Sequence, residues 1–483
     1  MSRDVERWAA GCLLASFPGH DAPDWIRRWL ERGLGGIVLF ADNVRDGEQV
    51  AEVTGALRHE QPNLVVAIDE EGGDVTRLEA DSGSSYPGNL ALGFVDDVEL
   101  TRAVAGAIAD ELRAAGVTLN LAPVADVNSN PRNPVIGVRS FGSQPELVAR
   151  HVAAFVTGTQ ERDVAACAKH FPGHGDTAVD SHLDLPTVDS DRDELLVGPL
   201  LPFRAAVEAG VAAIMTAHIL APALDSVPAT LSEPVVTGLL RRELGFAGAI
   251  VSDALEMRAI SAHVGIEEGA VRALAAGVDA LCIGHDVDDG LVERVHGALL
   301  EAVSSGRLRR ERLEEAAAAV ARLGRFTSVA GSNGAPPAPE IGAEAARRAI
   351  RVRGEVALDG PPFVVELEPA PLVAAGPAAH GLGSELTARR SASAVVSLHD
   401  RPGDAAEVVR SAQGRPLVLV LRDAARHSWQ RATASDLLEL RPDAIVVETG
   451  LPGWKPSGVT AYIETLGSGR VNLAAAADLL VPS

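Results

Sequence analysis

The chain contains little cysteine and few of the aromatic residues that line long binding grooves. Its 483 residues include three cysteines, two tyrosines and five tryptophans. Cys12, Cys167 and Cys282 each lie in an apolar run, so we expect buried thiols of a reducing compartment and no disulfide framework. HExxH and CxxC motifs are absent, which argues against the common zinc sites.

Positive charge is also in short supply. Lys and Arg number 43 against 66 Asp and Glu, a net charge of −23. Such an acidic surface disfavours nucleic acids and anionic membranes as partners and favours solubility. No apolar run is long enough to span a membrane, and the start MSRDVERWAAGCLLASF lacks the basic region and cleavage site of a secretory signal. We therefore expect a cytoplasmic location.

Apolar residues make up 47% of the chain, and its length favours two domains. Eight apolar runs alternate with helical patterns over about the first 325 residues. This α/β alternation predicts a (β/α)8 barrel, with an open doubly wound sheet as the alternative. The expected strands are Cys12–Phe17, Gly36–Phe40, Leu64–Asp69, Val117–Val127, Val164–His170, Ala212–His218, Ala249–Asp253 and Ala280–Gly284.

The composition changes at residues 327–341, where Gly, Ser, Pro and Ala predict a linker between domains 1–326 and 342–483. The last part again alternates and predicts a smaller three-layer α/β domain, which lacks a phosphate-binding loop or dinucleotide fingerprint. Its expected strands are Phe363–Glu368, Ala394–Leu398, Leu417–Leu421 and Ala444–Val447, and its expected helices are Ala343–Arg351, Ala405–Ser411 and Ala434–Leu440.

The segment Lys169–Pro186 (KHFPGHGDTAVDSHLDLP) carries many titratable groups directly after a predicted strand. A solvated loop is one interpretation. A metal site is another, although the spacing of its ligands does not match a common motif. A third is a His–Asp dyad, in which Asp180 orients the ring of His182 so that it gives and takes a proton near neutral pH.

Polar side chains also follow the other predicted strands, at the end where a barrel places its chemistry. Asp69 ends the third strand, with Arg77 beyond it, and Arg139 follows the fourth. His218 ends the sixth strand, as a pocket residue or a satisfied core histidine. Asp253 ends the seventh and suits either a pocket carboxylate or the N-cap of a helix over Leu255–Ala262.

The run KHFPGHGDT followed by DSH resembles the signature of family-3 glycoside hydrolases, in their β-N-acetylglucosaminidase branch. The resemblance covers roughly the first 325 residues. It implies Asp253 as the nucleophile and His182 with Asp180 as the acid/base. It implies that the first sugar is bound by Asp69, Arg77, Arg139, Lys169 and His170. The sequence departs from the family at Glu70 and Asp74, where two acids replace a glutamine and an arginine.

The resemblance implies a retaining exo-β-N-acetylglucosaminidase that removes terminal GlcNAc from cell-wall fragments or chitooligosaccharides without a cofactor or metal. The scarcity of tyrosine and tryptophan favours a small pocket for one terminal sugar. A β-glucosidase, a dual-specificity β-glycosidase and an N-acetylglucosaminide phosphorylase with phosphate as acceptor are the chemical alternatives. A non-catalytic sugar-binding protein is the alternative from another class.

Overall fold

The structure is a computed structural model that describes residues 2–326, 340–370, 374–375, 380–399 and 404–482. Most of the linker expected at 327–341 lies outside these residues. Contacts divide the chain into two units. The first comprises Met1–Glu71, Val98–Ile136 and Gly142–Ala338, and the second comprises Gly72–Asp97, Gly137–Phe141 and Pro339–Ser483. Two short segments from within the first 326 residues therefore group with the C-terminal part.

The first unit is built on eight parallel strands. Their order is β7-β6-β5-β4-β3-β2-β1-β8, and a parallel bridge between Val251 and Ala280 joins the two ends, so the predicted (β/α)8 barrel is confirmed. The strands are β1 (Leu13–Ala15), β2 (Gly36–Leu39), β3 (Val65–Ile68), β4 (Leu119–Asn120), β5 (Ala165–Phe171), β6 (Ala213–Thr216), β7 (Ala249–Ser252) and β8 (Leu281–Cys282).

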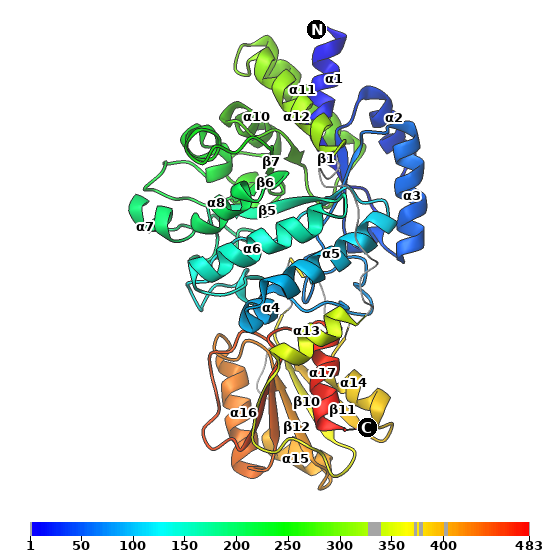
Figure 1. Cartoon of the computed structure of the whole chain (residues 1–483), viewed down its shortest axis with the longest axis vertical. Helices are drawn as coiled ribbons and strands as arrows, with labels where there is room; N and C mark the ends of the chain where they lie inside the picture. The colour runs from blue at the N-terminus through cyan, green and yellow to red at the C-terminus, as the bar shows by residue number, and fades with distance from the viewer. Residues whose placement is uncertain (1, 327–339, 371–373, 376–379, 400–403, 483) are drawn as a thin grey trace. The chain divides into compact units, whose positions relative to one another are not determined.

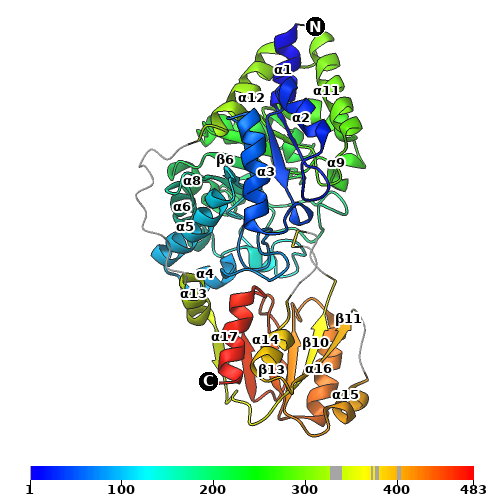
Figure 2. The ribbon, with the colours of Figure 1, turned by 90° about the vertical axis from the view of Figure 1, so that its right-hand side faces the viewer.

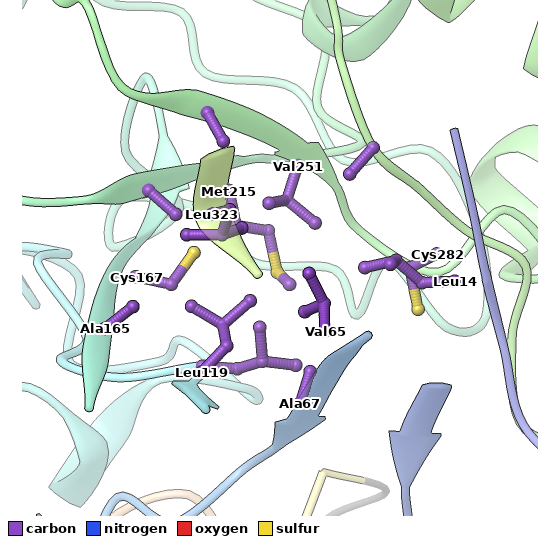
Figure 3. Packing of buried hydrophobic residues seen from close by; sticks show 14 of the residues in the cluster. Leu14, Val65, Ala67, Leu119, Ala165, Cys167, Met215, Val251, Cys282 and Leu323 are labelled. Carbon is purple, nitrogen blue, oxygen red and sulfur yellow. The ribbon is translucent and has the colours of Figure 1, made fainter. Parts of the chain in front are cut away.

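The barrel strands are buried throughout because they are apolar runs covered on both faces. Side chains from every strand meet in one cluster inside the barrel, which Figure 3 shows from close by. Cys167 and Cys282 belong to this cluster, and all three cysteines are buried and free, as predicted.

Helices surround the barrel, and Figure 1 shows α5, α6 and α8 side by side on its outside. In α2 the buried residues Ile26, Trp29 and Leu30 share one face at helical spacing. The helices of this unit are α1 (Arg3–Gly11), α2 (Asp24–Arg32), α3 (Gly47–Glu60), α5 (Val98–Ala114), α6 (Pro145–Gln160), α7 (Arg192–Val197), α8 (Leu201–Glu208), η4 (Pro234–Glu243), α9 (Arg258–Ser261), α10 (Ile266–Ala276), α11 (Asp289–Ser304) and α12 (Arg310–Leu323). No helix among the described residues is both long enough and apolar enough to cross a membrane.

The second unit contains a mixed six-stranded sheet in the order β11-β10-β12-β13-β14-β9, in which only β9 is antiparallel. One apolar cluster joins the sheet to α15 and α16, and another joins its opposite face to α14 and α17, so the three layers are those predicted (Figure 2). Its strands are β9 (Arg351–Arg353), β10 (Phe363–Glu368), β11 (Ala394–His399), β12 (Leu417–Leu421), β13 (Ile445–Glu448) and β14 (Ala461–Glu464). Its helices are α4 (Asn89–Val95), α13 (Ile341–Ala349), α14 (Leu382–Arg389), α15 (Ala405–Ala412), α16 (Ser428–Leu440) and α17 (Arg470–Leu480).

Candidate active site

Lys169, on β5, lies buried between two carboxylates that follow β3. Its ammonium nitrogen is 2.6 Å from Oδ1 of Asp69 and 2.7 Å from Oε1 of Glu71. The side chains of Lys169 and Glu71 are each 2% exposed, whereas that of Asp69 is 18% exposed. An unpaired ammonium at this depth would be costly, so the two acids are what allow a lysine here. Asp69 remains the member of the trio that a ligand can reach.

His170 is held by a buried carboxylate that the sequence analysis did not assign to the site. Its Nδ1 lies 2.6 Å from Oδ2 of Asp126, and Asp126 itself is completely buried. Because a carboxylate only accepts hydrogen bonds, Nδ1 of His170 carries the hydrogen. Asp126 also accepts the backbone N–H of His174 at 2.6 Å, so it fixes both the ring and the chain that follows it.

Asp180 and His182 form the dyad that the motif predicts. Nδ1 of His182 lies 2.7 Å from Oδ1 of Asp180, and the backbone N–H of His182 donates to the same oxygen at 2.9 Å. Burial opposes ionisation of Asp180, but the hydrogen bonds from the ring and backbone of His182 outweigh it and lower the pKa of Asp180. Asp180 is therefore an anion that orients the ring of His182 through Nδ1.

Asp253 follows β7 and keeps its charge despite being buried. Burial raises its pKa, but the interactions with the nearby rings of His170, His218 and His182 and with the N–H of Ala254 outweigh that effect and lower the pKa below the ordinary value. Its Oδ1 accepts the N–H of Ala254 at 2.8 Å. The helix in this region is α9, whose N-cap is Met257, so the alternative of Asp253 as a helix N-cap is wrong.

His218 supports the turn that carries Asp253. Its Nε2 donates to the carbonyl oxygen of Ala254 at 3.0 Å, and its Nδ1 lies 2.9 Å from Oγ1 of Thr230. Burial is the main reason that the pKa of His218 is lowered, which favours a neutral ring. Of the two interpretations of His218, the structure supports the buried histidine whose two ring nitrogens both have hydrogen-bond partners.

The two acids that depart from the family pattern have separate surroundings. Glu70 is buried, and its backbone N–H and C=O pair with the amide side chain of Asn120 at 3.1 and 2.9 Å. Asp74 lies in the second unit, where its carboxylate accepts from Nη2 of Arg422 at 2.7 Å and from the N–H of Ser468 at 2.7 Å. The carboxylate of Asp74 thus holds its loop to the C-terminal sheet.

Arg77 and Arg139 also belong to the second unit. Nη2 of Arg77 donates to the carbonyl oxygen of Ala374 at 2.6 Å. Arg139 ends the short helix Gly137–Arg139 and is buried, and its carbonyl oxygen accepts from Nδ2 of Asn89 at 2.7 Å. The structure thus brings Asp69, Lys169 and His170 to the ends of β3 and β5 in the barrel, and places the two arginines in the other unit.

Two carboxylates that hold candidate site residues were not found by sequence reasoning: Glu71, which pairs with Lys169, and Asp126, which pairs with His170. Glu71 was hidden in a run of acids, and nothing in the sequence pairs Asp126 with a histidine 44 residues away. Among the described residues, no group of three or more His, Cys, Asp or Glu side chains is arranged to hold a metal ion. The arrangement offers an ionised carboxylate, Asp253, within electrostatic range of the Asp180–His182 pair, which suits nucleophilic attack with proton transfer.

Known proteins match the part of the chain that contains this arrangement. Residues 18–323 match the model described as the glycosyl hydrolase family 3 N terminal domain. The chain belongs to glycosyl hydrolase family 3. The assignment suggested by the KHFPGHGDT motif is thereby confirmed.

Similar family members cover different shares of the chain. Beta-hexosaminidase A of Pseudoalteromonas piscicida is 39% identical over 317 residues, which are 60% of this chain and 53% of that protein. The matched part thus spans about half of that relative. Beta-hexosaminidase of Thiobacillus denitrificans is 36% identical over 65% of this chain and 94% of its own length. The solved family 3 beta-N-acetylglucosaminidase from Paenibacillus sp. str. FPU-7 is 35% identical, with a TM-score of 0.87 over 98% of this chain and 96% of its own.

Proposed function

We propose that the protein is a retaining exo-β-N-acetylglucosaminidase that removes terminal GlcNAc from cell-wall fragments or chitin-derived oligosaccharides. The observation that carries the proposal is that His182, hydrogen-bonded to Asp180, is near enough to Asp253 to help lower the pKa of that carboxyl group, which keeps it ionised as a nucleophile must be. The names of the similar proteins support the choice of an N-acetylhexosamine as the sugar that is removed.

In the first step, a carboxylate oxygen of Asp253 attacks the anomeric carbon while protonated His182 gives its Nε2 hydrogen to the leaving oxygen. The C1–O bond to the aglycone breaks, and an ester between C1 and Asp253 forms. In the second step, neutral His182 takes a proton from water, and the resulting hydroxide oxygen displaces Asp253 from C1. Asp180 stabilises the imidazolium in both steps.

Sugar binding is assigned to Asp69, Arg77, Arg139, Lys169 and His170. Asp69 would accept hydrogen bonds from sugar hydroxyls, since it is the more exposed partner of Lys169. Lys169 would act mainly by holding Asp69 and Glu71 in place. We further propose that residues 1–326 and 342–483 form two domains, that catalysis takes place in the first, and that the protein is cytoplasmic.

Phosphate is a second acceptor that the dyad favours. After its proton has left, His182 is neutral, so it repels an incoming anion less than a glutamate would; two charges a few Å apart repel by about 4 kcal/mol at an effective dielectric near 20. A phosphate oxygen would then bond to C1 as the ester to Asp253 breaks, with the phosphate proton passing to His182. The pairing of Lys169 with two carboxylates weakens the attraction that its ammonium would add.

A panel of chromogenic aryl β-glycosides, assayed with and without millimolar phosphate, tests the proposal. We expect turnover of the N-acetylglucosaminide far above that of the glucoside. A higher rate with phosphate, together with a sugar 1-phosphate among the products, would establish phosphorolysis. Free sugar alone at saturating phosphate would leave water as the acceptor, and binding without turnover of any glycoside would contradict an enzymatic role.

A further inference from the structure

Ser181 stands between the two members of the dyad in the chain and is almost completely buried, with 2% of it exposed. Its hydroxyl contacts the ring of His174, with Oγ 3.1 Å from Nε2. Its carbonyl oxygen accepts the N–H of Ala259, in α9, at 3.3 Å. Ser181 therefore connects residues 180–182 to His174 through its side chain and to Ala259, which lies beyond Asp253 in the chain, through its backbone.

His174 is a fixed anchor for this hydrogen bond. Its N–H donates to Asp126 at 2.6 Å, and its carbonyl oxygen accepts from Nδ2 of Asn133 at 2.8 Å. Its Nδ1 lies 2.8 Å from Oγ1 of Thr177. Complete burial lowers the pKa of His174 to about 4, so its ring is neutral at physiological pH. A neutral ring has one donor and one acceptor, which the hydroxyls of Thr177 and Ser181 satisfy.

His174 and His170, which lies at the end of β5, both hydrogen-bond to Asp126. Asp126 receives the ring of His170 and the backbone of His174 through its two carboxylate oxygens. Any movement of His174 would therefore also disturb His170. The dyad, by contrast, is connected to this buried framework through Ser181, and His182 is 28% exposed at the side chain.

We propose that Ser181 is a positioning residue that holds the Asp180–His182 dyad in its catalytic place by hydrogen bonding to His174. The inference rests on the proposed function, because it acts through His182 as the acid/base. Displacing a catalytic group by about 1 Å costs on the order of 100-fold in rate. Loss of the Ser181 hydroxyl frees the dyad segment without touching substrate.

The test uses Ser181→Ala, with Ser181→Thr as the variant that keeps the hydroxyl. We expect Ser181→Ala to lower kcat/KM about 10- to 100-fold for a glycoside with a poor leaving group, and less than about threefold for an activated aryl glycoside. Ser181→Thr should recover most of the loss. Thr187→Ala, which changes an exposed residue directly after the segment Lys169–Pro186, is the matched control and should change neither value.

A double-mutant cycle separates positioning from a merely structural role. If Ser181 acts through His182, then Ser181→Ala should add no further loss in a His182→Ala background. Equal losses on both substrates, or an additional loss in that background, would overturn the inference, as would full activity of Ser181→Ala. Should Ser181→Ala fail to fold, Ser181→Cys keeps the side-chain volume with a weak donor and should show the same leaving-group selectivity.

A negative result for Ser181 can be distinguished from a failure of the proposed function. If His182→Ala itself shows no dependence on the leaving group, the acid/base assignment is wrong and the proposed mechanism falls. If His182→Ala behaves as expected and Ser181→Ala matches the wild type, only the positioning role of Ser181 is wrong.

Discussion

A single residue, Lys169, stabilises the end of the barrel at which β3 and β5 finish. Its ammonium separates the carboxylates of Asp69 and Glu71. Lys169→Met would leave two carboxylates close together in a buried place, and we expect a loss of about 3 kcal/mol in the free energy of unfolding. Urea denaturation measures the effect.

A second change tests whether charge is the cause. In the Lys169→Met background, Glu71→Gln removes one of the two carboxylates and should return part of the lost stability without restoring activity. A loss below about 1 kcal/mol for Lys169→Met, or no recovery with Glu71→Gln, would show that the two acids do not depend on this ammonium.

Several candidate site residues could be proposed from the sequence because they are close in the chain or end a strand. Asp180 and His182 are two residues apart, and their hydrogen bond was predicted and is observed. Asp126 was not assigned because its partner His170 lies on the next strand of the barrel, and only the register of β4 and β5 brings them together. Glu71 was missed because it lies in a run of acids and because Lys169 is far from it in the chain.

At the scale of elements, the chain after β5 is positioned by a close approach of two backbones. A Cβ on Gly175 would lie 1.8 Å from the carbonyl oxygen of Val127, which no side chain can tolerate. From the sequence alone, Gly173 and Gly175 suggest a loop with a freely moving backbone. Gly173 does need its φ of 124°, but Gly175 is required for contact with the segment after β4.

Gly175→Ala should therefore displace the segment that leads to Ser181 and the dyad. We expect at least a 10-fold loss of kcat/KM, on the order of the cost of a 1 Å misplacement, and a lower free energy of unfolding, measured together on the purified variant. Gly55→Ala is the control, because Gly55 lies inside α3 and a Cβ there meets nothing within 4 Å. It should stabilise the protein by about 0.5–1 kcal/mol with unchanged activity. Wild-type behaviour of Gly175→Ala would contradict the close-approach argument.

The strands with long apolar runs were predicted within a few residues, since burial on both faces makes them nearly uniform in hydrophobicity. In the second unit, β10 and β12 coincide with their predicted ranges. β9 (RVR) and β14 (AYIE) were missed because neither has the run of branched apolar residues that marks β13 (IVVE) as a strand. The helix expected over Ala343–Arg351 ends at Ala349, and Arg351 begins β9, where it pairs with Glu464 of β14. A three-residue edge strand of sequence RVR has no pattern that distinguishes it from a helix end.

In the whole molecule, segments that are neighbours in sequence do not always belong to the same compact unit. Gly72–Asp97 lies between barrel strands in sequence, yet it contacts the C-terminal residues through the pairing of Asp74 with Arg422. A boundary read from composition alone cannot anticipate this, because the pairing joins residues 348 positions apart. The number and type of domains are what composition and periodicity could predict.

Stability should depend on pH through Glu448. This residue is completely buried and accepts three backbone N–H groups, from Asp423, Ala424 and Gly450. Burial, with the nearby Asp423 carboxylate, raises the pKa of Glu448 from 4.5 to about 8. Between these values the folded protein holds a proton that the unfolded chain has released. Stability therefore falls as the pH rises from about 4.5 to 8, by on the order of 1 kcal/mol per pH unit.

Thermal unfolding of the wild type and of Glu448→Gln from about pH 5 to pH 8 measures this contribution. The difference in Tm between the two proteins should change across the range in favour of the variant at higher pH, because the amide that replaces the carboxyl group does not titrate. Parallel Tm curves would mean that Glu448 is ionised in the folded protein and that its three N–H donors outweigh its burial.

Asp253 is proposed to form a covalent ester with the sugar, and trapping that ester tests the mechanism. An activated, fluorinated N-acetylglucosaminide that reacts quickly and hydrolyses slowly is incubated with the enzyme, which is then digested and analysed by mass spectrometry. We expect the added mass of one sugar on the peptide containing Asp253, and no added mass on the same peptide of Asp253→Asn. A sugar attached to a different residue, or full turnover by Asp253→Asn, would contradict it.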